Sequence, residues 1–203
     1  MSTVSELNKP FFQTIQTSFK DVSTTPGVET VGFANAAEGL VSIFDVLGNA
    51  AFTIVQGDLK GNIAKVRARY AKAPEQSGTL EDLVKNEMAE NKGKLGTAGE
   101  GLMWLIRGLK FTLLGLQSSQ NNPSEELAQS FTKAYEGSLK PHHGWVIKQA
   151  FGLAMKATPY RKDFYTRLGG PEAEVELKGW LAGLEKIVSQ MESAYKSNGW
   201  GTV

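Results

Sequence analysis

Cysteine is absent from the 203 residues of this chain. Its absence excludes disulfide bonds, thiolate nucleophiles and cysteine-containing metal sites, and it is typical of a protein that works in the reducing cytosol. Histidine is nearly absent too, since the two that occur are neighbours, His142 and His143. Adjacent side chains on a helix diverge by about 100°, so this pair is not expected to bind one metal ion together. We therefore predict neither a metal site nor a cofactor.

An excess of charge of one sign is also missing. The 22 Lys and Arg residues oppose 21 Asp and Glu residues, which leaves a net charge of +1. A nucleic-acid-binding surface needs a strong positive excess, so we expect no nucleic-acid partner. The N-terminal sequence MSTVSELNKPFF has no basic segment followed by an apolar run, and no stretch reaches the roughly 18 to 20 apolar residues of a membrane span. The sequence therefore predicts a cytoplasmic protein whose contact with membranes is peripheral and transient.

The motifs of common enzyme classes are missing as well. The chain contains no HExxH, GxSxG, P-loop or dinucleotide-binding fingerprint. Asp58 and His143 are candidates for an acid–base pair, but no residue near either of them in sequence is an obvious nucleophile. We therefore predict that the protein is not an enzyme.

What the sequence does contain is apolar residues at helical spacing along most of its length. The repeat is nearer 3.6 residues than 2 in each periodic segment, which is typical of helices rather than strands. We expect a single all-α domain over residues 1–203, with about eight helices packed as a two-layer sandwich. The expected helices lie near residues 10–22, 30–48, 52–69, 79–91, 101–116, 124–140, 145–157 and 172–196, with a further short one near 163–168. In the last long helix we expect Val175, Trp180, Leu184, Ile187, Val188 and Met191 to face inward.

Three polar residues stand out in the third of these segments. Asp58, Asn62 and Lys65 are spaced i, i+4 and i+7, so a helix places them on one face over roughly 10 Å of its length. A carboxylate acceptor, an amide and an ammonium donor together suit the recognition of a polyhydroxylated group. The alternative is an ordinary solvated helix face.

Two tryptophans also have two interpretations each. Trp104 lies in the most apolar helix, where it is either a core aromatic or a flat platform on which a sugar ring stacks. Trp145 follows Pro141 and Gly144, so it is either half-buried at a helix start or an anchor at a membrane interface, a zone that indole prefers.

Four blocks of the chain resemble the glycolipid transfer protein family. They are FDVLGNAAFTIVQGDLKGNIAKV, LMWLIRGLKF, KAYEGSLKPHHGW and ATPYRKDF, and they occur in the family's order between about residues 30 and 168. The resemblance is closest to the fungal type linked to heterokaryon incompatibility. It implies a two-layer sandwich of eight helices that binds one glycosphingolipid, of the galactosyl- or glucosylceramide type, and moves it between membranes as a monomer without hydrolysing it.

The resemblance also implies roles for individual residues. Asp58, Asn62, Lys65 and Trp104 match the residues that bind the sugar head group. His143, with Asp58, matches the group that holds the ceramide amide, and Trp145 matches a membrane-contacting tryptophan. The family's apolar pocket positions correspond to Phe44, Leu47, Val55, Phe111, Leu139 and Phe151. The C-terminal SNGWGTV departs from the animal pattern, so no role carries over to Trp200.

Two other functions compete with lipid transfer. One is a helical signalling module that senses lipid in fungal vegetative incompatibility. The other is a carrier for a phosphorylated sphingolipid, but a phosphate calls for a cluster of Arg or Lys rather than an Asp–Asn pair with a stacking tryptophan.

Overall fold

The computed structural model describes residues 10–48 and 50–203, and within these ranges it contains helices and turns but no β-strand. Helix α1 (Thr30–Val41) and helix α2 (Ile43–Leu47) are separated only by Ser42, whose backbone stays right-handed helical, so the two form one bent helix. The remaining α-helices are α3 (Thr53–Lys72), α4 (Leu80–Glu90), α5 (Thr97–Asn121), α6 (Leu127–Gly137), α7 (Trp145–Lys156), α8 (Arg161–Leu168) and α9 (Gly170–Ser197).

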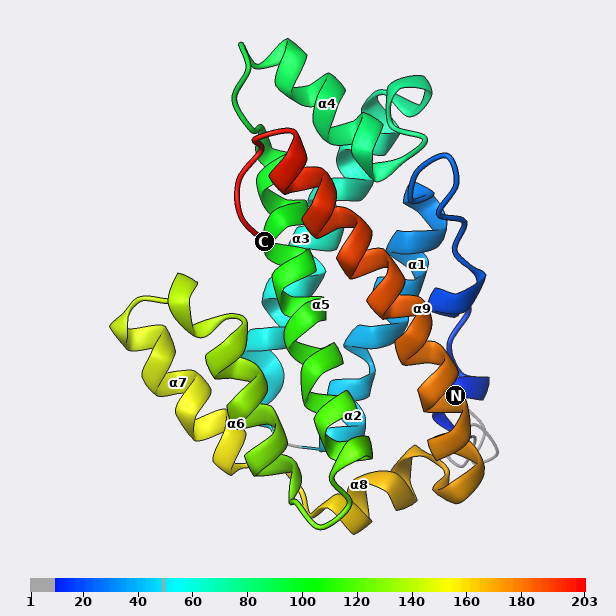
Figure 1. The fold of residues 1–203 in the computed structure, drawn as a ribbon, viewed down its shortest axis with the longest axis vertical. Coiled ribbons are helices and arrows are strands. Elements are labelled where there is room, and N and C mark those ends of the chain that lie inside the picture. Colours follow the sequence, from blue (N-terminus) through cyan, green and yellow to red (C-terminus); the bar gives the residue numbers. More distant parts are fainter. Residues whose placement is uncertain (1–9, 49) are drawn as a thin grey trace, which may run out of the picture.

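Helix α5 runs through the middle of the molecule (Figure 1). It packs against α6 and α9 in its own layer and against α3 in the layer behind, where α3 also contacts α1. Most of the residues of α5 are buried, which explains why its sequence is apolar on nearly every side. The predicted two-layer, all-α architecture is therefore confirmed.

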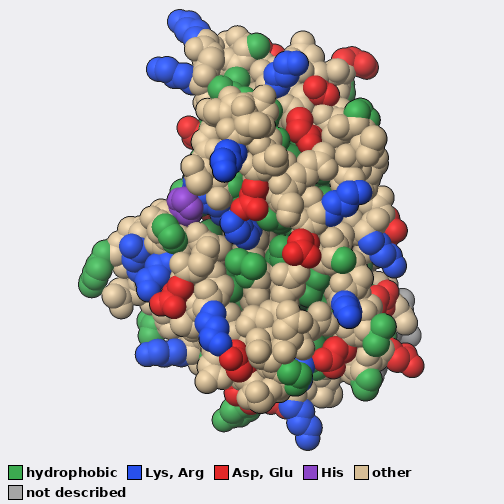
Figure 2. Space-filling model, in the orientation of Figure 1, with side chains coloured by type: hydrophobic (Ala, Val, Ile, Leu, Met, Phe, Trp, Pro, Cys, Tyr) green, Lys and Arg blue, Asp and Glu red, His purple; other side chains and the backbone are tan. Residues whose placement is uncertain are grey.

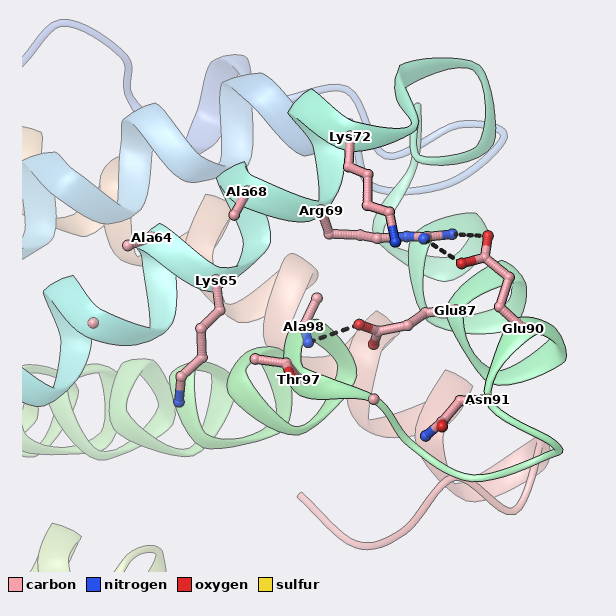
Figure 3. Close-up of a pocket in the computed structure, with 12 residues that line it drawn as sticks. Ala64, Lys65, Ala68, Arg69, Lys72, Glu87, Glu90, Asn91, Thr97 and Ala98 are labelled. Atoms are coloured by element: carbon pink, nitrogen blue, oxygen red, sulfur yellow. Dashed lines mark hydrogen bonds and ion pairs between the residues drawn. The ribbon is translucent and has the colours of Figure 1, made fainter.

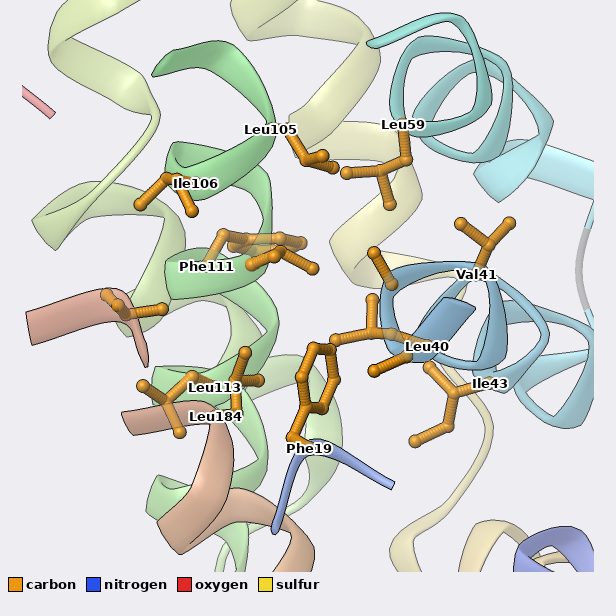
Figure 4. Packing of buried hydrophobic residues seen from close by; sticks show 14 of the residues in the cluster. Phe19, Leu40, Val41, Ile43, Leu59, Leu105, Ile106, Phe111, Leu113 and Leu184 are labelled. Carbon is orange, nitrogen blue, oxygen red and sulfur yellow. The ribbon is translucent and has the colours of Figure 1, made fainter. Parts of the chain in front are cut away.

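Close contact between the two layers depends on glycines in α5. A Cβ atom at Gly108 would lie 2.7 Å from the Leu59 side chain of α3, and one at Gly101 would lie 2.7 Å from Lys65 Cδ. Real Cβ atoms essentially never lie this close to another atom, so any larger residue at these positions would force the Leu59 or Lys65 side chain to move. The apolar core continues from this interface through both layers, and Figure 4 shows part of it, with Leu59, Leu105, Phe111 and Phe19 among the buried side chains.

The N-terminal segment differs from the prediction of one helix over residues 10–22. The structure has two 3₁₀ turns instead, Phe11–Gln13 and Phe19–Asp21. The Thr14 hydroxyl donates to the Phe11 carbonyl at 2.6 Å, and such local side-chain bonds compete with continued helix formation. The apolar residues of this segment nevertheless face the core, because Phe11, Phe12 and Phe19 all pack around the Trp180 ring.

Two further expectations need correction. Val175, expected to face inward from the last helix, is 76% exposed. The segment Thr30–Leu47 is long and apolar enough to cross a membrane, contrary to the expectation that no stretch would be. The segment forms α1 and α2 and is 56% buried within the fold. We therefore interpret it as a core helix, which has the same length and hydropathy.

Candidate functional site

A row of polar side chains on α3 forms one side of the site. Asp58 Oδ2 accepts a hydrogen bond from Asn62 Nδ2 at 3.2 Å, and Lys65 Nζ donates to Asn62 Oδ1 at 2.9 Å. Asn62 is buried, whereas Asp58 and Lys65 are exposed. Although Asp58 is exposed as a residue, partial desolvation of its carboxyl group raises its pKa, while the Lys65 charge and the Asn62 hydrogen bond oppose that rise. The buried amide thus fixes both charged partners and leaves their outer faces open.

Trp104 on α5 forms the facing wall and is half-buried. Its ring is nearly parallel to that of His143, with centroids 6.0 Å apart and an interplanar angle of 17°. The His142 ring meets it edge-on at 6.2 Å. The guanidinium carbon of Arg107, one turn further along α5, lies 4.6 Å from the indole centroid. The indole orientation is therefore set by contacts from three side chains.

His143 follows the 3₁₀ turn Lys140–His142 at the junction between α6 and α7. Its Nδ1 lies 3.1 Å from the Tyr135 hydroxyl, and its ring contacts Phe151 at 4.7 Å between centroids. Burial, with the nearby charges of His142, Lys148 and Arg107, lowers the pKa of His143. Burial also raises the pKa of Tyr135, so its hydroxyl keeps its proton. When this hydroxyl donates to Nδ1, the neutral imidazole carries its own proton on Nε2 and is a donor there.

These residues surround one cavity of about 340 Å³. Asp58, Asn62, Lys65, Trp104 and His143 all line it, so the structure brings together five of the residues singled out in the sequence. The remaining wall is mainly apolar: Ile54, Val55, Leu59, Gly108, Leu139, Ile147 and Phe151. A polar mouth over an apolar interior is typical of sites for amphiphilic ligands.

The predicted apolar pocket residues separate into two groups. Val55, Leu139 and Phe151 line the cavity. Phe111 does not line the cavity in this structure; it is buried on α5, with its ring 6.0 Å from that of Phe151. Phe44 and Leu47 are buried in the core and do not line the cavity in this structure, and the Phe44 ring packs on Phe52 at 5.5 Å.

Trp145 begins α7 and is 75% exposed. Other large apolar side chains are exposed as well, namely Val146 and Leu153 of α7, Tyr160 just after it, and Ile54 at the start of α3. Ile54 and Ile147 are partly exposed and also line the cavity, so they connect its apolar wall with the protein surface. Helices α6 and α7 project from the left side of the molecule in Figures 1 and 2. Figure 2 shows hydrophobic side chains at the tip of this projection and a histidine where it joins the rest of the molecule.

A larger groove, of about 700 Å³, lies between α3, α4 and the start of α5 (Figure 3). Three of its charged groups, those of Arg69, Glu87 and Glu90, already have partners within the protein. Arg69 makes two hydrogen bonds to Glu90, and Glu87 accepts from the amides of Ala98 and Gly99 at the start of α5. The aromatic residues and histidines of the smaller cavity are absent from its walls. We therefore take the smaller cavity as the functional site.

Sequence reasoning missed several residues of the site. Ile54, Leu59, Gly108 and Ile147 line the cavity, and Tyr135 and Arg107 support His143 and Trp104. Arg107 could have been noticed from the sequence, because it is a charged residue one turn after Trp104 in a largely apolar helix. Nothing in the sequence links Tyr135 to His143, since their contact depends on the turn between α6 and α7.

Comparison with known proteins places the whole arrangement in a family. Residues 28–170 match the sequence profile described as glycolipid transfer protein (GLTP). The chain is 49% identical over 181 residues to a glycolipid transfer protein of Aureobasidium melanogenum, covering 88% of this chain and 89% of that one.

Solved structures agree with the sequence match. The crystal structure of HET-C2, a fungal glycolipid transfer protein, superimposes with a TM-score of 0.85 at 42% identity and covers 92% of this chain and 96% of its own. A structure of FAPP2, which selects simple glycosphingolipids using the GLTP fold, gives a TM-score of 0.84 at 30% identity, over 96% of this chain and 98% of its own. The profile match and the 49% identity together show that this chain belongs to the glycolipid transfer protein family.

Proposed function

We propose that this protein binds one glycosphingolipid and transfers it between membranes without chemical change. The observation that carries the proposal is the convergence of five polar and aromatic side chains, from α3, α5 and the α6–α7 junction, at the mouth of one apolar cavity. The family to which the chain belongs, with its fungal relatives described as glycolipid transfer proteins, supports the same function.

The polar row fits the hydroxyl groups of a sugar. Ionised Asp58 accepts hydrogen bonds from hydroxyls, and Lys65 donates to their oxygens. Each bond with a charged partner contributes about 1.5–3 kcal/mol. The Trp104 indole offers an apolar face on which the C–H side of a sugar ring packs. A galactosyl- or glucosylceramide therefore suits the site, in line with the preference of the FAPP2 relative for simple glycosphingolipids.

The ceramide amide would bind at the same mouth, next to His143. His143 carries its Nε2 proton toward the amide carbonyl when the Tyr135 hydroxyl donates to Nδ1. Asp58 would accept a hydrogen bond from the amide N–H as well as from the sugar. One amphiphile would thus satisfy the polar groups at the mouth, while its chains enter the apolar part of the cavity.

The hydrocarbon chains need more room than the cavity provides. Its volume of about 340 Å³ is at the lower end of the range for small-molecule sites, and a ceramide has two long chains. We propose that the cavity widens between the layers as the chains enter. Phe111, Leu47 and Phe44, which are now packed behind or beside it, would then join the pocket wall.

The exposed apolar side chains at the start of α3 and along α7 form the proposed membrane contact, with Trp145 as its anchor. Because they adjoin the mouth of the cavity, docking there would place the site next to the lipid surface. We further propose that residues 1–203 act as one domain, as a monomer in the cytoplasm, without a cofactor and without nucleic acid. Lipid sensing in a signalling role uses the same binding step and is the second candidate.

Replacing Asp58 tests the proposal. Asp58→Val is expected to abolish transfer of glucosylceramide between vesicles while leaving the helical circular dichroism unchanged, because it removes the charged acceptor but no packing contact. Asp163→Val, at an exposed carboxylate on α8, is the matched control and should transfer normally. Normal transfer by the Asp58 variant would remove the polar row from the mechanism.

A further inference from the structure

Arg107 is a buried cation that the proposed glycolipid contacts leave unexplained. It is 7% exposed, and none of the ion pairs formed by the described residues includes it. Its Nε also has no hydrogen-bond partner within the described part of the chain. A buried guanidinium without a carboxylate is costly and is rare without a specific use.

The contacts of Arg107 connect two distant parts of the chain. On one side its guanidinium lies over the Trp104 ring, 4.6 Å from the ring centroid. On the other side its Nη2 donates a hydrogen bond to the backbone carbonyl of Thr202, 95 residues later. An arginine over an indole is a strong cation–π pair when it is shielded from water. Arg107 therefore links the Trp104 indole to the C-terminal segment.

The C-terminal segment that supplies this carbonyl is itself fixed to the body of the protein. The Trp200 amide donates to the Tyr195 carbonyl at 2.9 Å, and the Trp200 ring packs edge-on against the Tyr195 ring at 5.7 Å. Gly201 then turns the chain back with φ of +133°, a value that L side chains rarely adopt. Val203 packs on the apolar core. Tyr195 is fully buried, so the segment has a rigid base.

We infer that Arg107 is a positioning residue for sugar recognition: held by the Thr202 carbonyl, it fixes the Trp104 indole in the orientation that receives the sugar ring. The inference rests on the proposed function, since it presupposes that a sugar stacks on Trp104. It assigns a part in ligand selection to the C-terminal segment, although the hydrogen bonds of the polar row found among the described residues join Asp58, Asn62 and Lys65 only to one another. Loss of this support should lower affinity for glycosylated lipid and leave affinity for unglycosylated ceramide unchanged.

The test compares Arg107→Met with Arg161→Met. Arg161 is a matched control, because its guanidinium also lies over an aromatic ring, that of Tyr165, at 4.3 Å, away from the cavity. Affinities for glucosylceramide and for ceramide are measured by competition between vesicles. Arg107→Met should weaken glucosylceramide binding by about tenfold, which corresponds to about 1.4 kcal/mol, and leave ceramide binding unchanged. Arg161→Met should change neither affinity.

A second readout reports the indole directly. The Trp104 indole N–H resonance, identified by its loss in Trp104→Phe, should shift in Arg107→Met and stay in place in Arg161→Met. If Arg107→Met does not fold, Gly201→Val replaces it, because a β-branched residue is strained at φ of +133° and should displace the Thr202 carbonyl. The same selective loss for glucosylceramide is expected of that variant.

The outcomes separate this inference from the proposed function. If the wild-type protein binds glucosylceramide no better than ceramide, both fail. If the wild type prefers glucosylceramide and Arg107→Met keeps that preference, only the role of Arg107 is overturned. An equal loss of affinity for both lipids also overturns it, because that result indicates a structural role alone.

Discussion

At the scale of single residues, burial acts on the two titratable groups of the site in opposite directions. It raises the pKa of Asp58 and lowers the pKa of His143, and both changes disfavour the charged form. For Asp58 the Lys65 charge opposes the change, whereas for His143 the surrounding positive charges add to it. His143 is therefore neutral near pH 7 and has one donor and one acceptor nitrogen.

The lowered pKa of His143 predicts a loss of stability in acid. Because the folded-state pKa is below the ordinary value of 6.5, the stabilising contribution is fully present above that value. It is lost as pH falls through the folded-state pKa. His143→Gln removes this titration, so the fall in melting temperature between about pH 7 and pH 5 should be shallower than in the wild type. Thermal unfolding followed by circular dichroism checks this.

His143→Gln should not remove all of the acid sensitivity, because a second histidine contributes to it. Burial also lowers the pKa of His142, so His143→Gln should retain part of the acid sensitivity. A variant whose melting profile parallels the wild type at every pH would contradict the assignment to His143.

Residue spacing was enough to predict the polar row, because Asp58, Asn62 and Lys65 share one helix and their relative positions are local. It left the roles of Trp104, His143 and Trp145 open between core and site, and the family resemblance supplied those roles. Tyr135 and Arg107 escaped prediction because their partners come from other elements. Contacts of that kind depend on the packing of the helices, which no single stretch of sequence encodes.

At the scale of elements, the contact between α3 and α5 decides whether the site forms. Gly108 lets α5 approach Leu59, and both residues line the cavity. The expected long helix near residues 101–116 is confirmed but begins four residues earlier, at Thr97. The start of α5 is stabilised by Glu87 of α4, whose carboxylate accepts from the Ala98 and Gly99 amides. This contact between separate helices is not visible in the local sequence.

The glycine at this contact gives a stability prediction. Gly108→Ala should destabilise the protein by about 1–3 kcal/mol, the usual cost of overpacking, since its Cβ would lie 2.7 Å from the Leu59 side chain. Gly179→Ala in α9 is the matched control, because nothing lies within 4 Å of its Cβ position. It should stabilise by about 0.5–1 kcal/mol. Urea unfolding measures both, and a neutral Gly108→Ala would show that the helices separate easily.

Helix α7 gives a prediction about membranes. Trp145→Ala should weaken binding to vesicles by roughly tenfold, because an exposed indole no longer enters the interface. Transfer should slow in proportion, with the lipid-binding cavity intact. The control is Val175→Ala, which removes an equally exposed apolar side chain from α9. If both variants bind vesicles as the wild type does, α7 is not the docking surface.

At the scale of the whole molecule, selectivity and affinity come from different parts of the site. Burying hydrocarbon contributes roughly 0.8 kcal/mol per CH₂ relative to water, but a donor membrane buries the same chains. The hydrophobic contribution therefore nearly cancels during transfer. Discrimination between lipids must then come from the polar mouth, where a wrong head group would cover Asp58 and Lys65 without offering hydroxyl partners to their charged groups.

The overall fold was largely predictable because helical periodicity extends over most of the chain. The two-layer arrangement follows from broad apolar stripes on several helices, and the family resemblance implies the same architecture. The prediction was wrong where local side chains compete with the helix, as in residues 10–22. It was also wrong for Val175, which lies about 200° around α9 from the buried residues Ala173 and Leu177 and is therefore on the solvent-facing side of the helix.

Lipid uptake from mixed vesicles tests the central claim most directly. The protein is incubated with vesicles that contain equal amounts of glucosylceramide, ceramide and ceramide phosphate, recovered, and analysed by native mass spectrometry. We predict one lipid per protein molecule, predominantly glucosylceramide. A protein recovered without lipid, or with the three lipids in equal amounts, would contradict the account.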